Sequence, residues 1–247
     1  MVYQDPFGAL NPRMKVLDIV GEPLRVHRLT QGRAAYREKV MGLLEKVGLK
    51  AEMADRYPHE FSGGQRQRIG IARALALQPD LLLCDEPVSA LDVSVQAQVL
   101  ELFKEIRDEF NLSYLFISHD LAVVAALADR VMVMRRGHVV EEGASDCVFN
   151  DPRHPYTRAL IAASPEPDVD RRLDLAAVAA GAGEPTLHTA PHEVRNRLGR
   201  VACEQPLAQT GARHGILVDI SRPVTAPWKP RPAGTRLTRI NISIAVF

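Results

Sequence analysis

The sequence is short of cysteine and of long apolar runs, and each shortage argues against a class of protein. Its 3 cysteines, Cys84, Cys147 and Cys203, lie far apart without CxxC spacing, which argues against a disulfide framework, a zinc site or an iron–sulfur cluster and fits a reducing cytoplasm. No apolar run approaches the roughly 20 residues of a membrane-spanning helix, and the N-terminus lacks the basic start and apolar core of a signal peptide. If the protein works at a membrane, we expect a partner to supply the span.

An excess of charge of one sign is also lacking. The 31 Lys and Arg residues balance 30 Asp and Glu residues to a net charge of +1, which gives no electrostatic case for nucleic acid as a partner. The hydrophobic content of 46% is enough for one good-sized core or one and a half domains. The 8 histidines include His119, which is considered below; the other seven form no metal-ligand spacing, and we interpret them as structural or surface residues.

Hydrophobic periodicity predicts alternating helices and strands. The predicted helices are 15–27, 34–47, 66–77, 93–110 and 121–128. The predicted strands are 81–84 and 113–117, followed by a hairpin of 131–134 and 139–140 with Gly137 at its turn. This order predicts a doubly wound α/β fold whose parallel strands are buried on both faces.

The C-terminal part of the sequence differs from the rest in amino-acid composition and lacks clear hydrophobic periodicity. Beyond residue 167 an Ala/Gly stretch, 176–183, leads into a segment dotted with Pro and Arg. No element is predicted there until the apolar residues 240–247, and the composition favours disorder.

Polar residues directly follow both predicted strands, as Asp85-Glu86 and Ser118-His119. Ligands bind at the carboxyl ends of parallel strands, so one crevice can hold both pairs. Asp85 can hold Mg²⁺ through a carboxylate oxygen, and Glu86 can polarise a water for attack on a phosphoryl group. His119 can contact a γ-phosphate. Taken singly, Asp85-Glu86 also fits a solvated strand end, and His119 fits a helix cap or a packed side chain.

Residues 62–65 (SGGQ) combine a serine with two glycines at a predicted helix start. Gly63 and Gly64 let backbone amides approach an anion, and the following helix directs its positive end to the same point. Ser62 adds a hydroxyl donor. A plainer alternative stays open, in which Ser62 is only the N-cap of the helix.

Five motifs in one order resemble those of the ABC ATPase family. Residues 61–68 (FSGGQRQR) resemble the family's signature, and residues 81–87 (LLLCDEP) resemble its Walker B strand. Residues 89–92 (SALD) match the D-loop, residues 117–120 (ISHD) match the switch-histidine region, and Gln4 matches the Q-loop glutamine. Order and spacing together make the resemblance specific.

Two further stretches narrow the resemblance to a subfamily. Residues 4–14 (QDPFGALNPRM) and 150–160 (NDPRHPYTRAL) resemble the oligopeptide and dipeptide importers. The resemblance covers roughly residues 2–175. It implies a P-loop NTPase-like α/β core with a parallel sheet and a helical subdomain, which binds ATP and Mg²⁺.

By this resemblance, the residues at the strand ends would serve ATP hydrolysis. Asp85 and Gln4 would organise Mg²⁺, and Gln4 would also link the metal to a transmembrane partner. Glu86 would be the general base for the attacking water, and His119 would contact the γ-phosphate.

The remaining motif residues would act across a subunit interface. Ser62, Gly63, Gly64 and Gln65 would face the ATP held by a second ABC ATPase subunit in a head-to-tail dimer. Asp92 would lie at the seam of that dimer.

The resemblance also divides the chain. Residues 1–12 would form the Q-loop segment, 13–60 the helical subdomain, 61–145 the remaining ATPase core, 146–175 the importer extension and 176–247 a divergent tail. The helical subdomain would receive transmembrane permease subunits. A solute-binding protein would be an indirect partner that delivers the solute to the permease. The chain would then be a peripheral protein at the cytoplasmic face of the plasma (inner) membrane.

The sequence departs from the family at the phosphate-binding loop. The family carries a GxxxxGK[ST] string upstream of the Q-loop, with amides and a lysine that hold the phosphates, and these 247 residues contain none. We expect the sequence to start after this loop and the first strands of the family domain. We therefore expect exposed apolar surface with poor solubility, and little or no ATP hydrolysis by the isolated chain.

Three interpretations of function stay open. The leading one is an energising subunit for import of oligopeptides, dipeptides or nickel, with the solute undetermined. A truncated, non-catalytic fragment is the second, and an in-frame GxxxxGK[ST] upstream of the Met1 codon would argue against it. The third is a soluble non-transport ABC ATPase acting on ribosomes or DNA. It predicts a second cassette, a coiled-coil insertion or a basic arm, and the sequence has none of these.

Overall fold

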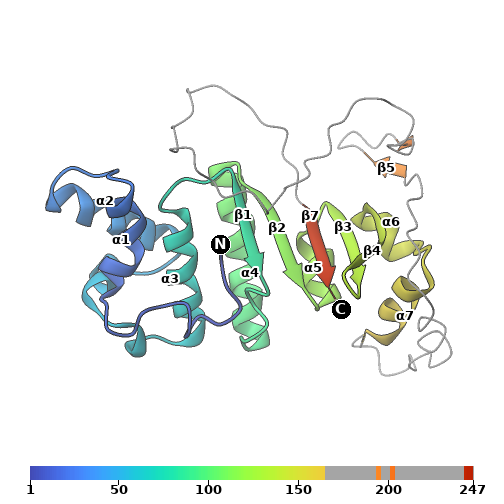
Figure 1. Cartoon of the computed structure of the whole chain (residues 1–247), viewed down its shortest axis with the longest axis horizontal. Helices are drawn as coiled ribbons and strands as arrows, with labels where there is room; N and C mark the ends of the chain where they lie inside the picture. Colours follow the sequence, from blue (N-terminus) through green and yellow to red (C-terminus); the bar gives the residue numbers. More distant parts are fainter. Residues whose placement is uncertain (165–192, 196–200, 204–241, 247) are drawn as a thin grey trace.

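The computed structural model describes residues 1–164, 193–195, 201–203 and 242–246, which form a helical part beside a β-sheet (Figure 1). The helical part consists of α1 (Val16–Val26), α2 (Arg33–Lys46), the 3-10 helices η1 (Ala51–Asp55) and η2 (Pro58–Glu60), and α3 (Gly63–Leu75). Around the sheet lie α4 (Val93–Phe110), α5 (Leu121–Leu127), α6 (Ser145–Asn150) and α7 (Pro155–Ala163). The strands are β1 (Leu81–Asp85), β2 (Ser113–Ser118), β3 (Arg130–Arg135), β4 (His138–Ala144), β5 (Glu193–Arg195), β6 (Val201–Cys203) and β7 (Ile242–Val246).

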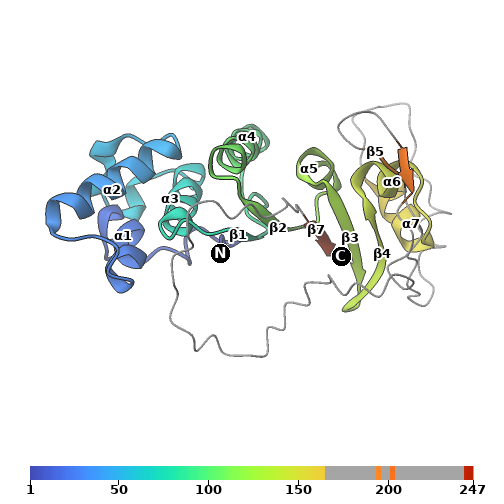
Figure 2. The ribbon, with the colours of Figure 1, turned by 90° about the horizontal axis from the view of Figure 1, so that it is seen from above.

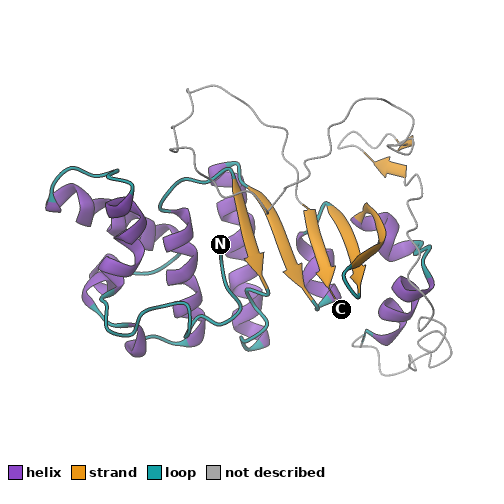
Figure 3. Cartoon of the chain, in the orientation of Figure 1, coloured by secondary structure: helices purple, strands orange, loops and turns teal. Residues whose placement is uncertain are grey.

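The predicted α/β fold is confirmed, and its five-stranded sheet has the order β1-β2-β7-β3-β4. Neighbouring strands run parallel from β1 to β3, and β4 pairs antiparallel with β3. Figure 3 shows the helices around this sheet. A separate antiparallel pair, β5 and β6, forms a second small sheet.

The predicted helices and strands are present, and local capping explains where several of them begin. Helix α3 starts at Gly63, earlier than expected, because Ser62 and Gln65 form a capping box that satisfies the first turn. Helix α5 starts where the Asp120 carboxylate accepts bonds from the amides of Ala122 and Val123. The short helices α6 and α7 were not predicted, because they are too brief to show clear periodicity.

The expectation that the strands are buried on both faces is wrong. Helices α4 and α5 lie on the same face of the sheet (Figure 2). Along β2, Tyr114 and Phe116 are buried, whereas Leu115 and Ile117 between them are partly exposed. Because both crossover helices pack on one face, side chains that point to the other face keep partial access to water.

The buried apolar side chains form two clusters. The larger cluster joins the helical part to β1, β2 and α4, and the ring of Phe103 packs edge-to-face on those of Tyr114 and Phe116. The smaller cluster lies between α5, β3, β4 and α6 and includes Val124 and Val140.

The predicted disorder of the tail lies mostly outside the described residues, and the three short strands β5, β6 and β7 are its described parts. Among the described residues, no helix combines the length and the hydropathy needed to cross a membrane.

The start of α3 packs so closely on α4 that Gly64 cannot be enlarged without a shift. A Cβ atom at Gly64 would lie 2.3 Å from Cγ1 of Val95, whereas one at Gly63 would lie 3.6 Å from the nearest atom, Cδ2 of Leu91. Val95 cannot easily turn away, because a valine in a helix has one favoured rotamer.

We therefore predict that Gly64→Ala destabilises the protein by about 1–3 kcal/mol, although alanine favours a helix. Gly63→Ala is the matched control and should be neutral or stabilise by up to about 1 kcal/mol. Urea unfolding followed by circular dichroism measures both. Adding Val95→Ala to Gly64→Ala should restore stability, and equal effects of the two glycine substitutions would contradict the packing.

A buried carboxylate fixes the segment after the sheet. Glu141 is 0% exposed, and its two oxygens accept bonds from the backbone amides of Arg153 (2.8 Å) and His154 (3.0 Å). Its neighbour Glu142 is partly exposed and pairs with Arg130 at 3.2 Å.

We predict that Glu141→Ala costs about 2–4 kcal/mol, because it leaves two amides without their charged acceptor. Glu142→Ala should cost at most about 1 kcal/mol, as expected for an accessible ion pair. Thermal unfolding of the two variants makes the comparison, and a Glu141 variant as stable as the Glu142 variant would refute this role.

Candidate functional site

The N-terminal segment reaches the site by pairing with the free edge of β1. The amide of Val2 donates to the carbonyl of Leu83 at 2.8 Å, and the amide of Asp85 donates to the carbonyl of Val2 at 2.9 Å. These bonds form a parallel bridge between Val2 and Cys84. Gln4, two residues further along, is thereby carried to the carboxyl end of β1.

Helix α3 and a local turn hold the rest of this segment. The Asp5 carboxylate accepts bonds from the amides of Phe7 (2.8 Å) and Gly8 (3.0 Å). Arg73 on α3 donates to the carbonyl of Ala9 at 2.7 Å. The guanidinium of Arg66 stacks over the Phe7 ring at 3.6 Å, and Phe7 itself remains 65% exposed.

Glu86 leaves the strand in an unusual backbone conformation. Its φ is 43°, in the left-handed region that costs energy for residues other than glycine. The amide of Glu86 donates to the carbonyl of Ile117 at 2.9 Å, and its carbonyl accepts from the Ser89 hydroxyl at 3.0 Å. These contacts on both sides hold the turn and direct the Glu86 side chain away from β1.

Three of the predicted site residues meet at the Glu86 carboxylate. Nε2 of Gln4 donates to Oε2 of Glu86 at 2.7 Å, and Nδ1 of His119 lies 3.1 Å from Oε1 of Glu86. The Glu86 side chain is 23% exposed and that of His119 is 57% exposed, so water reaches both groups. The predicted convergence of Asp85-Glu86 with Ser118-His119 at one sheet edge is therefore present.

The residues expected to hold Mg²⁺ offer oxygen ligands but do not form a complete cage. Within the described part of the chain, no group of three or more His, Cys, Asp or Glu side chains is gathered as a metal site. Asp85 supplies a partly buried carboxylate, and Gln4 uses its nitrogen for Glu86, so its Oε1 is the atom that could serve a metal. This donor set fits Mg²⁺, which typically takes one or two protein oxygens and completes its shell with phosphates and water.

The serine–glycine turn lies apart from this trio in the single chain. The Ser62 hydroxyl accepts from the amide of Gln65 at 3.4 Å, and Gln65 accepts from the amide of Ser62 at 3.0 Å. The N-cap role left open from the sequence is thus present. No hydrogen bond or ion pair between described residues joins residues 62–64 to Gln4, Glu86 or His119.

Asp92 and its neighbours connect the turn to α4. Asp92 is exposed and stands at the N-cap of α4, where its carbonyl accepts the amide of Gln96 at 2.8 Å. Gly63 and Gly64 pack toward Leu91 and Val95, on either side of Asp92. The serine–glycine turn and Asp92 therefore belong to one surface.

Sequence reasoning missed the supporting role of Asp120. Its carboxylate caps α5, and its amide donates to the Ser118 hydroxyl at 3.0 Å. Nε2 of Gln96 donates to Oδ2 of the same Asp120 carboxylate at 3.4 Å. Asp120 thereby ties Ser118, on the other side of His119, to the start of α5. An Asp just before a helical apolar pattern is the N-cap signal that could have identified it.

Cys84 stands under the site as a buried thiol. It is 0% exposed within the larger apolar cluster, and this burial raises the pKa of its thiol above the usual range. Burial also lowers the pKa of the Met1 amino group. The thiol is therefore held neutral and is chemically inert while this packing is intact.

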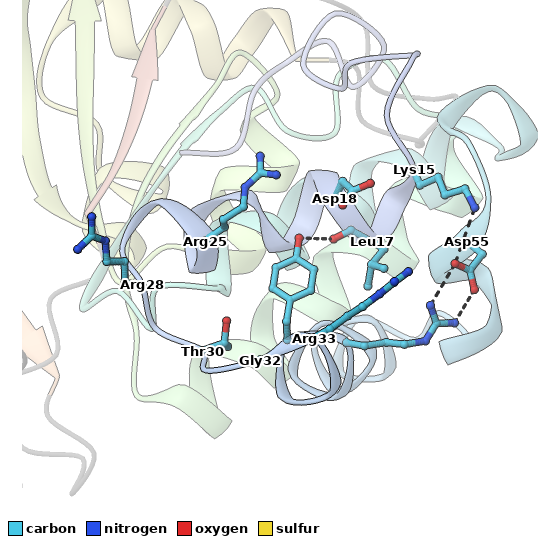
Figure 4. Close-up of a pocket in the computed structure, with 11 residues that line it drawn as sticks. Lys15, Leu17, Asp18, Arg25, Arg28, Thr30, Gly32, Arg33 and Asp55 are labelled. Carbon is cyan, nitrogen blue, oxygen red and sulfur yellow. Dashed lines mark hydrogen bonds and ion pairs between the residues drawn. The ribbon is translucent and has the colours of Figure 1, made fainter.

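A cavity of about 530 Å³ lies in the helical part, away from the predicted site residues (Figure 4). It is lined by Lys15, Leu17, Asp18, Arg25, Arg28, Thr30, Gly32, Arg33, Tyr36, Arg37 and Asp55. Hydrogen bonding by Arg37 lowers the pKa of Asp55, and Lys15 stands 4.0 Å from the same carboxylate. None of the motif residues lines this cavity.

Two family models match the sequence. Residues 1–89 match the family described as ABC transporter, and residues 140–192 match the oligopeptide/dipeptide transporter C-terminal region.

Relatives with known roles match over the same part of the chain. The oligopeptide transport ATP-binding protein OppF of Escherichia coli is 56% identical over 170 residues, covering 69% of this chain and 51% of OppF. The dipeptide transport ATP-binding protein DppF of Escherichia coli is 56% identical over 174 residues, covering 70% of this chain and 52% of DppF. OppF of Bacillus subtilis is 54% identical over 170 residues, which cover 69% of this chain and 56% of that OppF. The chain spans about half the length of these relatives.

A solved structure supports the fold. The protein cbiO1 from Clostridium perfringens, described as part of the ABC transporter complex cbiONQ, aligns with a TM-score of 0.54 and 28% identity, over 61% of this chain and 58% of that one. These matches show that the chain carries an ABC transporter domain segment at residues 1–89 and an oligopeptide/dipeptide transporter C-terminal region at residues 140–192, in agreement with the strand-end residues Gln4, Glu86 and His119.

Proposed function

We propose that the chain belongs to an ATPase subunit that energises import of oligopeptides or dipeptides through an ABC transporter. The observation that carries this proposal is the contact of Gln4 and His119 with the two oxygens of Glu86. A carboxylate, an amide and an imidazole at the end of a parallel strand are suited to position a water beside a phosphoryl group. The relatives named for peptide transport support the choice of solute class.

Glu86 is the general base in this proposal. A carboxylate has about four lone-pair directions, and the contacts with Gln4 and His119 use only two of them. A water at the exposed side of Glu86 can therefore donate a hydrogen bond to it and pass it a proton during attack. His119, directly after the next strand, would contact the γ-phosphate as well as Glu86.

Asp85 and Oε1 of Gln4 would hold Mg²⁺, which supplies charge neutralisation for the phosphates when bound. Gln4 would then connect the general base to the metal, because its Nε2 binds Glu86 and its Oε1 would bind Mg²⁺. Its segment continues into the exposed Phe7 ring, which offers an apolar contact to a membrane-embedded partner. In this way the metal site is linked to the permease.

A second subunit completes the site. In a head-to-tail dimer, the amides and hydroxyl of the Ser62–Gly64 turn face the nucleotide held by the other subunit, with Gln65 behind the turn and Asp92 at the seam. The exposure of Ser62 and Asp92 on one surface supports this arrangement. The helical part, with α1 and α2, receives the permease at the cytoplasmic face of the membrane, and a solute-binding protein delivers the peptide.

The first test separates chemistry from binding. We predict that Glu86→Gln lowers ATP hydrolysis by the assembled transporter roughly 10²–10⁴-fold, because it removes the base and keeps the shape. Binding of a fluorescent ATP analogue should change little. Glu101→Gln, at an exposed position on α4, is the matched control and should hydrolyse ATP at the normal rate. Normal hydrolysis by the Glu86 variant would rule out the assigned role.

The second test concerns the single chain. The described site presents two carboxylates, Asp85 and Glu86, and a carboxylate pair repels a triphosphate unless cations accompany it. We therefore predict weak ATP binding and little hydrolysis by the purified chain, with both rising when partner subunits and Mg²⁺ are added and falling again with EDTA. Isothermal titration and phosphate release measure the two steps. Rapid Mg²⁺-dependent hydrolysis by the chain alone, abolished by Glu86→Gln, would overturn the prediction.

A further inference from the structure

The segment that carries Gln4 lies between two elements that come later in the chain. Figure 1 shows the start of the chain between β1 on one side and α3 on the other. The Val2 bridge fixes this segment to β1, but the bridge ends two residues before Gln4. The contacts that hold the segment beyond Val2 therefore decide where the Gln4 side chain points.

Side chains of α3 supply the next hydrogen bonds. Nε2 of Gln67 donates to the carbonyl of Tyr3 at 3.4 Å. That carbonyl belongs to the peptide group between Tyr3 and Gln4, so the bond fixes the peptide plane directly before Gln4. Gln67 is only 2% exposed, and a buried amide is costly unless it is hydrogen-bonded, which favours the arrangement that keeps this bond.

Arg73 holds the segment on the far side of Gln4. Its Nη1 donates to the carbonyl of Ala9 at 2.7 Å, and such a charge-assisted bond is stronger than one between neutral groups. Between these two anchor points, the Asp5 carboxylate closes a local turn by accepting two backbone amides. Gln4 thus lies in a short stretch that is held at both ends by one helix.

The Gln4 amide must be directed within a narrow range to meet Glu86. The side chain of Gln4 is long, flexible and exposed, and its Nε2 reaches Oε2 of Glu86 at 2.7 Å. A hydrogen bond weakens steeply as its angle departs from linear, and a misplacement of about 1 Å can lower a catalytic rate by about 10²-fold. An exposed side chain of this length keeps such a contact only when its backbone is held.

We propose that Gln67 and Arg73 are positioning residues, which act on ATP hydrolysis through Gln4 by fixing the backbone on either side of it. This inference rests on the proposed function, because it assigns a task to the contact between Gln4 and Glu86. The hydrogen bonds of both residues go to backbone carbonyls of the segment. A change in either residue therefore alters the geometry of Gln4 and leaves the strand-end carboxylates in place.

A comparison of two arginines of α3 tests the proposal. Arg73→Met and Arg68→Met each remove a bond from a partly buried guanidinium to a backbone carbonyl, that of Ala9 in the first case and that of Val47, the C-cap of α2, in the second. In the assembled transporter, Arg73→Met should lower kcat for ATP hydrolysis roughly 10-fold and change KM for ATP less than about twofold. Arg68→Met is the matched control and should keep kcat near the native value. Arg73→Lys, which retains a donor, should recover part of the lost rate.

A double substitution separates positioning from a general loss of structure. Gln67→Met keeps a side chain of similar length and removes the donor, so it should lower kcat about 5-fold even if Arg73→Met fails to fold. In a Gln4→Ala background, neither Gln67→Met nor Arg73→Met should lower kcat further, because their route to the site is already lost. A purely structural role would lower the rate equally in both backgrounds, and that result would overturn the proposal.

Hydrogen exchange on the full-length chain locates the change without relying on activity. The backbone amides of residues 7–9 are hydrogen-bonded within the segment, and they should exchange roughly 10-fold faster in Arg73→Met and in Gln67→Met. In Arg68→Met, faster exchange should appear instead at residues 47–49, beside the carbonyl that loses its donor. Native exchange of residues 7–9 in both variants would contradict the anchoring by α3.

The positioning role and the proposed function fail in different ways. Normal hydrolysis by Glu86→Gln removes the general base, and this inference fails with it. If Glu86→Gln is impaired but Arg73→Met and Gln67→Met hydrolyse ATP as the native protein does, only the positioning role is overturned.

Discussion

The parallel pairing of β1 on both of its edges is the constraint on which the site depends. On one edge the Val2 bridge carries Gln4 to the end of the strand, and on the other the bond from Glu86 to Ile117 ties the turn to β2. His119 follows β2 directly, so it arrives at the same level. Three residues that are distant in sequence meet because three backbone segments are in register.

The strained turn at Glu86 makes sense within this constraint. A left-handed backbone at a glutamate is unfavourable by itself, but here the Ile117 carbonyl and the Ser89 hydroxyl hold it from opposite sides. The conformation separates the two adjacent carboxylates, so that Asp85 stays with the strand and Glu86 turns to Gln4 and His119. The two adjacent carboxylates therefore occupy different environments, one at the end of β1 and the other beside Gln4 and His119.

Much of the fold could be predicted from the sequence, because long amphipathic helices and short apolar strands have clear periods. The boundaries of α4 were predicted correctly, and the two pairs at the strand ends were expected at one edge. The position of β7 could not be predicted, since it depends on a pairing across residues 165–241 and on a space made by α5. The one-sided burial of β2 was missed because an apolar run such as 113–117 does not reveal which face a helix will cover.

In the candidate site, the carboxylates and His119 could be identified from motif order, whereas their contacts could not. Nothing in the sequence specifies that Gln4 binds Glu86 by its nitrogen, or that the amide of Asp120 binds the Ser118 hydroxyl across His119. These features arise from caps and bridges, which depend on single hydrogen bonds.

The buried thiol of Cys84 gives the molecule an internal reporter of its own assembly. It pairs with Val2 through the bridge that delivers Gln4 and lies within the larger apolar cluster, so it becomes accessible to an alkylating reagent only when this packing opens. The rate at which Cys84 is labelled therefore follows the local opening of the packing around β1, the strand on which the trio depends. A ligand that stabilises the assembled site would slow this labelling without touching the sulfur.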